Sequence, residues 1–181
     1  MNEAGFEKRI ARIAKRAISQ RHVVRLKAPL LYEVTVDHRL QFEVDPARPS
    51  RGQSAFETDL AIFERRGEAL EIPRVVLELK TKISTHDVLT YSAKAVRHKR
   101  IYPYLRYGLI AARETAVPGC FYLHNEGLDF CVTLGAMKRQ EEERVIARLL
   151  RKELRVSRLL ERIALGETKS SVYRSAVTCR V

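Results

Sequence analysis

The nine residues RVVLELKTK (74–82) place Glu78 and Lys80, two residues apart and of opposite charge, next to the apolar run Val75, Val76, Leu77 and Leu79. Side chains alternate across a β-strand, so Glu78 and Lys80 share one face with Val76, while the other face is apolar. A carboxylate carried into a buried sheet is costly unless it pairs with a cation or binds a metal. The run therefore predicts a buried strand with one of two roles for its charges. Either they form an ion pair, with each other or with Arg65 at a sheet edge, or they build a chemical site.

Hydrophobic periodicity places this strand third in a mixed order of helices and strands. We expect helix, three strands, helix and strand, then a hairpin and a long helix. These elements fall at residues 3–20, 22–37, 56–65, 74–82, 85–101, 108–114, 119–135 and 140–165. The mixture predicts an α/β fold with a mixed central β-sheet flanked by helices. A single domain over residues 1–181 is expected, with its core at 3–114 and the hairpin and helix as an extension at 115–166.

The charge balance narrows the class of partner. The chain has 34 lysines and arginines against 22 aspartates and glutamates, giving +12, which favours nucleic acid first and an anionic membrane surface second. No apolar run approaches the roughly 18 residues that span a bilayer, and the charged N-terminus lacks the apolar segment of a secretory signal. Cys120, Cys131 and Cys179 follow no zinc spacing and are expected to be reduced. These features predict a cytoplasmic protein with no membrane partner.

A second carboxylate lies in the strand before the charged run. Asp59 falls within ETDLAIF, and consecutive strands usually neighbour one another, so a hairpin would bring Asp59 near Glu78. Mg²⁺ typically takes one or two carboxylates and fills its remaining positions with water and substrate phosphate oxygens. The two strands therefore predict a magnesium site with Lys80 beside it.

Asp59, followed by Glu78-Leu79-Lys80 at the end of an apolar strand and then by a helix rich in Lys, Arg and Tyr, resembles the PD-(D/E)xK nuclease superfamily. That superfamily includes many restriction endonucleases and repair nucleases. The resemblance covers residues 3–114 and implies a restriction-endonuclease-like core of helix, three strands, helix and strand (α-β-β-β-α-β). It also implies Mg²⁺-dependent hydrolysis of DNA, with Mn²⁺ as a substitute. Thr58 departs from the pattern, because the family name places proline there.

The resemblance implies roles for particular residues. Asp59 and Glu78 would ligate the metal. Lys80 would lie near the attacking water, where it would lower the pKa of that water or stabilise charge in the transition state. Many members add a glutamate from the first helix, and Glu7 is the choice here. The alternatives are Glu3, Glu33 and Glu57.

The second predicted helix and the residue run before it supply cations for phosphate contacts. The predicted nucleic-acid-binding residues are Lys82, Lys94, Arg97, Lys99 and Arg100, with His98 as a further candidate. A solvated charged face is the competing interpretation of this run. Tyr91, on the apolar side of the same helix, is expected either to pack in the core or to contact substrate.

Several enzyme classes are excluded by absent motifs. The sequence has no H-E-x-x-H, no G-x-S-x-G and no glycine-rich phosphate loop before a helix. The apolar stripe of helix 140–165 either packs on its own sheet or forms a homodimer. We therefore predict a magnesium-dependent deoxyribonuclease. One alternative is a non-catalytic nucleic-acid-binding or accessory protein with the same basic surface. A weaker one is a protein that binds anionic membranes through residues 3–20.

Overall fold

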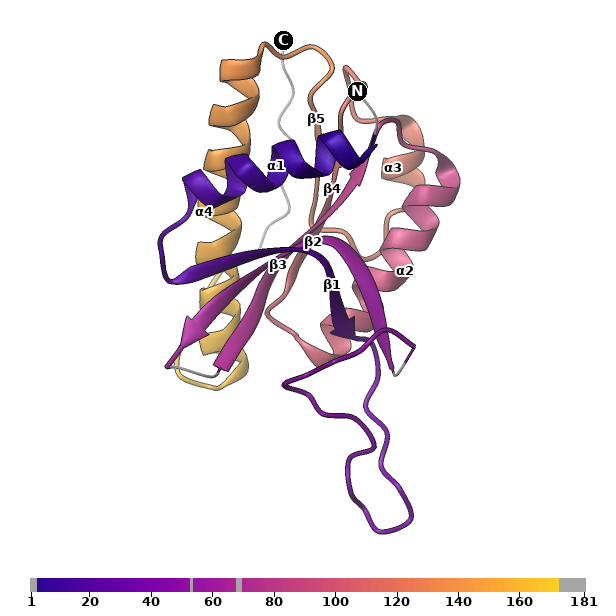
Figure 1. Ribbon diagram of the computed structural model, residues 1–181, viewed down its shortest axis with the longest axis vertical. Helices are drawn as coiled ribbons and strands as arrows, with labels where there is room; N and C mark the ends of the chain where they lie inside the picture. Colours follow the sequence, from indigo (N-terminus) through magenta and orange to yellow (C-terminus); the bar gives the residue numbers. More distant parts are fainter. Residues whose placement is uncertain (1–2, 53, 68–69, 173–181) are drawn as a thin grey trace.

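The computed structural model describes residues 3–52, 54–67 and 70–172. Within them the chain forms four α-helices and a five-stranded sheet (Figure 1). The elements are α1 (Glu3–Ala17), β1 (His22–Leu31), β2 (Ala55–Arg66), β3 (Leu70–Lys80), α2 (Thr85–Ile101), β4 (Arg106–Ala111), α3 (Gly119–His124), β5 (Phe130–Thr133) and α4 (Arg139–Ala164). The predicted α/β class, with a mixed sheet flanked by helices, is confirmed.

The five strands lie in the sheet in their order along the chain. β1, β2 and β3 pair antiparallel, whereas β4 and β5 continue the sheet parallel to β3. Parallel neighbours need a crossover connection, which α2 provides between β3 and β4, and α3 between β4 and β5. β3 is therefore paired on both sides, and residues 72–79 are buried without interruption.

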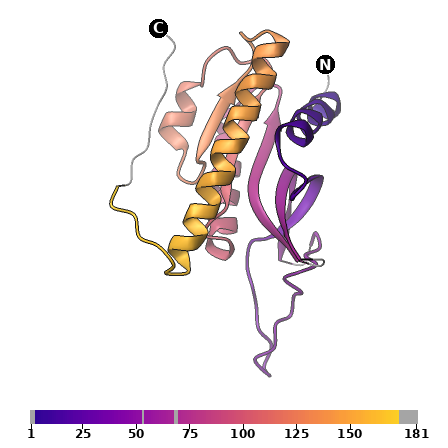
Figure 2. The same cartoon turned by 90° about the vertical axis from the view of Figure 1, so that its left-hand side faces the viewer.

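Helices cover both faces of the sheet. α1 and α4 pack on the face that carries Leu60, Leu77 and Leu79, and α2 and α3 pack on the face that carries Val76 and Tyr107. Seen from the side, α1 and α3 lie on opposite sides of the strands (Figure 2). This three-layer arrangement explains why β3 is mostly apolar. Arg74 and Glu78 are its buried charged residues.

The start of α2 follows the predicted signal. The Ser84 hydroxyl accepts a hydrogen bond from the Asp87 N–H, and the Asp87 carboxylate accepts one from the Ser84 N–H, which completes a capping box. Two backbone donors at the helix end are satisfied in this way. The cap fixes the direction in which α2 leaves β3.

The predicted C-terminal hairpin is wrong. Residues 119–124 form the short helix α3, and β5 pairs with β4 in parallel and not with a strand of its own hairpin. The reason lies in the predicted turn: Gly127 packs closely on α2, where an added Cβ would lie 2.6 Å from the Ser92 carbonyl oxygen. The Ser92 hydroxyl also accepts the N–H groups of Glu126 and Gly127. Short apolar runs do not distinguish strand from helix, so this contact with α2 decides the path.

The expected reduced thiols agree with the structure where it describes them. Cys120 and Cys131 are free and half-buried against the α2 side of the sheet. Burial raises the pKa of the Cys131 thiol to about 12. Cys179 lies outside the described residues.

The connection between β1 and β2 projects from the body of the molecule (Figure 1). The strand predicted over 22–37 is wrong beyond Leu31, where β1 ends. The residues that follow have a strand-like pattern but no partner strand, apart from one isolated bridge between Val36 and Phe42. Leu40 and Phe42 remain 84% and 68% exposed.

α4 packs on its own sheet through Ile146, Leu150 and Leu154. These residues of its apolar stripe are covered within the chain, whereas Leu159 is 45% exposed. The predicted homodimer would need residues of this helix outside the covered set. No helix among the described residues combines the length and the apolar composition needed to cross a bilayer.

One predicted phosphate contact, His98, lies fully inside the core. Its ring stacks on Tyr107 with centroids 5.7 Å apart, and its Nδ1 lies 2.9 Å from the Leu31 carbonyl oxygen. Burial lowers the pKa of His98 from 6.5 to about 4. His98 binds a proton more readily in the unfolded chain than in the folded one. Its contribution to the free energy of unfolding is therefore fully present above pH 6.5 and is lost as the pH falls toward about 4.

We expect His98→Gln to flatten this pH dependence, removing up to about 3 kcal/mol of the fall in unfolding free energy across that range. Urea unfolding at a series of pH values measures it. His86→Gln, an exposed histidine on the same helix, should keep the wild-type slope. Parallel curves for His98→Gln and the wild type would show that His98 carries none of the dependence.

Candidate active site

Three charged residues form one row across three neighbouring strands. Lys27 is not itself paired, but the β1–β2 pairs on either side of it put it opposite Asp59. Counting one position on from the last β2–β3 pair puts Asp59 opposite Glu78. The backbone ladder between β2 and β3 stops one position earlier, at Leu60 and Leu77. From there the two carboxylates take the place of ladder hydrogen bonds.

The exchange between side chains and backbone is reciprocal. Glu78 Oε2 lies 3.3 Å from the Asp59 N–H nitrogen, and Asp59 Oδ2 accepts the Leu79 N–H at 2.9 Å. Buried backbone donors need partners, so each carboxylate satisfies a group that the ending ladder leaves free. The structure thus brings together the two carboxylates that the sequence analysis paired.

Lys27 holds the outer end of the row. Its ammonium lies 2.7 Å from Asp59 Oδ1 and 2.8 Å from Glu7 Oε1. The Lys27 backbone has a φ of +53°, in the left-handed region that residues other than glycine rarely adopt. Lys27 is also skipped in the pairing of β1 with β2. Such backbone outliers concentrate at functional positions, where surrounding contacts hold them.

Glu78 lies at the inner end of the row and is 1% exposed. Its Oε1 accepts hydrogen bonds from the Lys94 ammonium, at 2.8 Å, and from the buried Tyr107 hydroxyl. Burial raises the pKa of Glu78, Lys94 opposes this increase, and the neighbouring Asp59 adds to it. The net result is a pKa above the ordinary glutamate value.

Asp59 has the opposite shift. Burial by itself would raise the pKa of Asp59, but the hydrogen bonds from the Leu79 N–H and the Lys27 ammonium outweigh it and hold the pKa below the usual value. The two adjacent carboxyl groups therefore have pKa values pushed apart, which is typical of sites that assign different roles to two acids.

Lys80 lies at the solvent end of β3, on the same face as Glu78. Its ammonium lies 5.5 Å from the centre of the Tyr91 ring and 3.9 Å from both Glu3 and Asp87. Burial would lower the pKa of Lys80, but Tyr91 and these carboxylates raise it above the ordinary value. Lys80 is therefore an ammonium at neutral pH.

Tyr91 is partly buried and lies between two lysines. The Lys94 ammonium lies 5.3 Å from the centre of the Tyr91 ring, and the Lys80 ammonium lies 5.5 Å from it. Burial is the main reason that the pKa of Tyr91 rises to about 12. The ring links the Lys80 position to the Lys94–Glu78 pair.

The four candidate glutamates lie in different places. Glu7 shares the Lys27 ammonium with Asp59, and Glu3 approaches Lys80. Glu33 contacts Ser54 in the long connection, and Glu57 lies 3.7 Å from Arg51. Glu7 is thus the candidate joined to Asp59 through a shared partner.

The predicted phosphate-binding cations divide into two groups. Lys82, Arg97 and Arg100 are exposed. Lys94 is paired with Glu78, and Lys99 is paired with Asp129 at 2.7 Å, with its pKa lowered mainly by burial. The first group faces solvent, whereas the second stabilises contacts within the chain.

Sequence reasoning missed Lys27 as a site residue, and it did not connect Tyr107 with Glu78. A lysine inside the first strand and a tyrosine at the second position of the fourth give no motif. Register across β1 and β2 would have paired Lys27 with Asp59, but the sequence does not fix that register. Thr58, at the position where the resemblance expects proline, is fully buried and donates to the Ala28 carbonyl oxygen.

Asp59 and Glu78 are the residues here that could hold a metal ion. A carboxylate oxygen can accept twice, and Glu78 Oε1 is already full, whereas Glu78 Oε2 and both Asp59 oxygens accept one hydrogen bond each. Within the described residues, no group of three or more His, Cys, Asp or Glu side chains could hold a metal ion. Water and substrate oxygens would have to complete the shell, as is usual for Mg²⁺.

Comparison with known proteins gives no assignment. No protein-family model matches the chain, and no curated protein sequence matches it.

We expect Lys27→Met to lower the free energy of unfolding by about 1 kcal/mol at neutral pH in a chelating buffer, because Glu7 and Asp59 then face each other without the shared cation. Adding Glu7→Gln should recover part of this loss. Chemical denaturation of the four proteins of the double-mutant cycle measures the coupling. Lys8→Met, an exposed lysine of α1, should stay within about 0.5 kcal/mol of the wild type. Strictly additive losses would contradict a shared ion pair.

Proposed function

We propose that this chain is a divalent-metal-dependent nuclease that hydrolyses DNA phosphodiester bonds, on a core of the restriction-endonuclease-like type. The observation that carries the proposal is the row of Asp59 and Glu78 at the end of the β2–β3 ladder, with Lys80 two residues further along β3. The order α1, β1, β2, β3, α2, β4 supports the proposed core. The charge of +12 supports a polyanionic substrate.

In this proposal Asp59 and Glu78 hold the metal, and Glu7 reaches the same site through its contact with Lys27. Bound Mg²⁺ would supply Lewis-acid polarisation of the phosphate and a more acidic water. The Lys80 ammonium would stabilise the negative charge that develops on the attacked phosphate. Tyr91 would keep Lys80 in position, since its ring lies against the ammonium.

The lysines on the carboxylates have a defined role in the same proposal. Lys94 offsets the buried charge of Glu78, and Lys27 offsets that of Asp59 and Glu7. Both ammonium groups would keep the acidic residues compatible with folding when no metal is bound. Exposed Lys82, Arg97 and Arg100, on and before α2, would contact the DNA backbone.

A second candidate is a non-catalytic nucleic-acid-binding protein on the same scaffold. The same two lysines favour it, because Asp59 and Glu78 already have cationic partners and are balanced without a metal. In that case the row stabilises the end of the ladder, and DNA binding depends on the basic surface.

We expect the wild type to cleave plasmid DNA when Mg²⁺ or Mn²⁺ is added and to be inactive in EDTA. Asp59→Asn and Lys80→Met should each reduce the cleavage rate by at least about 100-fold, because they remove a metal ligand and the charge at the phosphate. DNA affinity in EDTA should stay within about threefold for Lys80→Met, because a single cation contributes little to binding. Gel assays of cleavage and fluorescence anisotropy of binding measure the two effects.

Lys169→Met provides the matched control, since Lys169 is exposed and far along the chain from the row. It should cleave as the wild type does. Wild-type protein that binds DNA but leaves it intact with either metal would reject the nuclease and favour the second candidate.

A further inference from the structure

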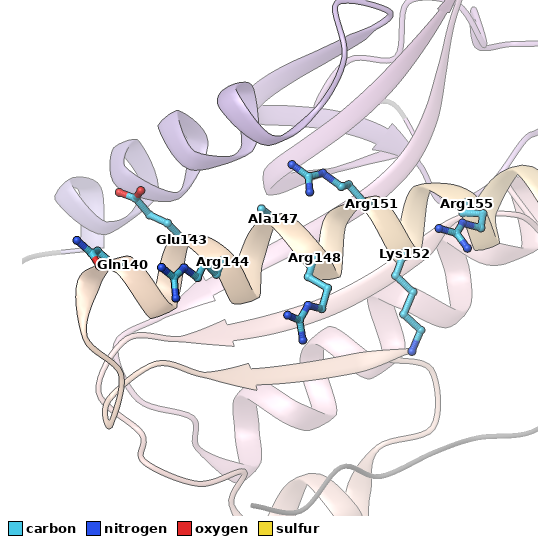
Figure 3. Close-up of a pocket in the computed structure, with 8 residues that line it drawn as sticks. All are labelled: Gln140, Glu143, Arg144, Ala147, Arg148, Arg151, Lys152 and Arg155. Carbon is cyan, nitrogen blue, oxygen red and sulfur yellow. The ribbon is translucent and has the colours of Figure 1, made fainter.

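α4 has a row of cations on its outer face that the candidate site does not use. Eight residues of α4 line a hollow on this face, and five of them are cations: Arg144, Arg148, Arg151, Lys152 and Arg155 (Figure 3). The other three are Gln140, Glu143 and Ala147. We call the five cations the α4 basic face. All five are exposed, and they extend over about 16 Å at the rise of an α-helix.

The charges of α4 are sorted between its two sides. Its buried glutamates pair with arginines from other elements: Glu142 with Arg9, Glu153 with Arg106, and Glu161 with Arg74. On the outer face, Arg151 donates to the Ala17 carbonyl oxygen, and Glu143 pairs with Arg139. Within the described residues, no ion pair involves the other four cations of the α4 basic face.

This sorting leaves a concentrated positive surface. Three glutamates of α4 are turned inward, and Glu143, on the outer face, pairs with Arg139. The outer side of the helix is therefore mostly cationic. α1, in the same layer, adds exposed cations to this side of the molecule. They are Lys8, Arg12, Lys15 and Arg16.

The α4 basic face lies on the other side of the sheet from the α2 face. α4 packs on the apolar cluster that contains Leu77 and Leu79, whereas Lys80, Lys94 and Tyr91 lie with α2. A DNA segment placed over Lys80 and the exposed cations of α2 therefore leaves α4 free. The two surfaces would contact different stretches of a polyanion.

The chemistry of the face favours a phosphate backbone over a lipid surface. Four of the five cations are arginines, whose planar guanidinium groups bind phosphate with two hydrogen bonds. Helices that lie on membranes insert an apolar face, but Ile146, Leu150 and Leu154 of α4 are buried in the protein. Arg148 and Lys152 point to one side of α4, whereas Arg151 points to the other side, toward α1 (Figure 3).

We propose that the α4 basic face is a second DNA-binding surface, which holds the backbone of duplex DNA independently of the Asp59–Glu78 site. Arg144, Arg148, Lys152 and Arg155 each neutralise a phosphate, and Arg151 supports the edge next to α1. The proposal does not rest on nuclease activity, because backbone binding needs neither a metal nor cleavage.

The test is the salt dependence of binding to a fluorescein-labelled duplex of about 20 base pairs, measured by anisotropy in EDTA. Each phosphate neutralised contributes about 0.9 to the slope of log affinity against log salt. The variant Arg144→Gln/Arg148→Gln/Lys152→Gln/Arg155→Gln should lower that slope by about 3 to 4 and weaken binding at low salt by at least about tenfold. Glutamine is a good helix former, and circular dichroism with urea unfolding confirms that the variant is folded.

A matched control removes four exposed cations elsewhere: Arg39→Gln/Arg48→Gln/Arg51→Gln/Lys169→Gln. A large change in the α4 variant and a small one in the control support the proposal. Equal slopes for the two variants would mean that net charge alone matters, and an unchanged slope in the α4 variant would also overturn the proposal. The proposal is also overturned if the α4 variant binds DNA as the wild type does but no longer co-sediments with phosphatidylserine vesicles. That result would assign the face to membranes. Failure of the nuclease proposal appears separately, as DNA that is bound and not cut.

Discussion

The end of the β2–β3 ladder is the constraint on which the rest of the site depends. Backbone pairing stops at Leu60 and Leu77, and the Asp59 and Glu78 carboxylates accept the N–H groups that would otherwise lack partners. These hydrogen bonds fix both side chains on rigid strands. Two adjacent buried carboxylates remain charged only when cations lie close to them, so this arrangement requires cationic partners. Lys27 and Lys94 are the cations that the fold brings there.

The same rule operates in the α4 layer. Each buried glutamate of α4 is matched by an arginine from another element, and Arg74, fully buried, joins Glu64 to Glu161. Removing one member of such a pair leaves a buried charge without compensation, so these contacts fix how α4 sits on the sheet. The arrangement also separates the charge of the molecule, because the carboxylates that face inward cannot neutralise the outer arginines.

Much of the architecture could be predicted from local pattern. β3 appears in the sequence as an apolar run of strand length, α2 begins at a capping box, and α4 has a long apolar stripe. The hairpin predicted at 119–135 failed because its apolar residues suit a short helix equally well, and the packing of Gly127 on α2 decides between them. Long-range contact of this kind has no local signature.

By itself, the sequence determined the α/β class, the order of the main elements and the proximity of Asp59 to Glu78, because alternation along a strand and adjacency of consecutive strands are local rules. Tertiary structure alone decided that Lys27 reaches Asp59 and Glu7, that Tyr107 and Lys94 both bind Glu78, and that His98 is buried. It also decided which arginines of α4 remain outside. These outcomes depend on strand register and on which helix covers which face, and both are set by the packing of the whole chain.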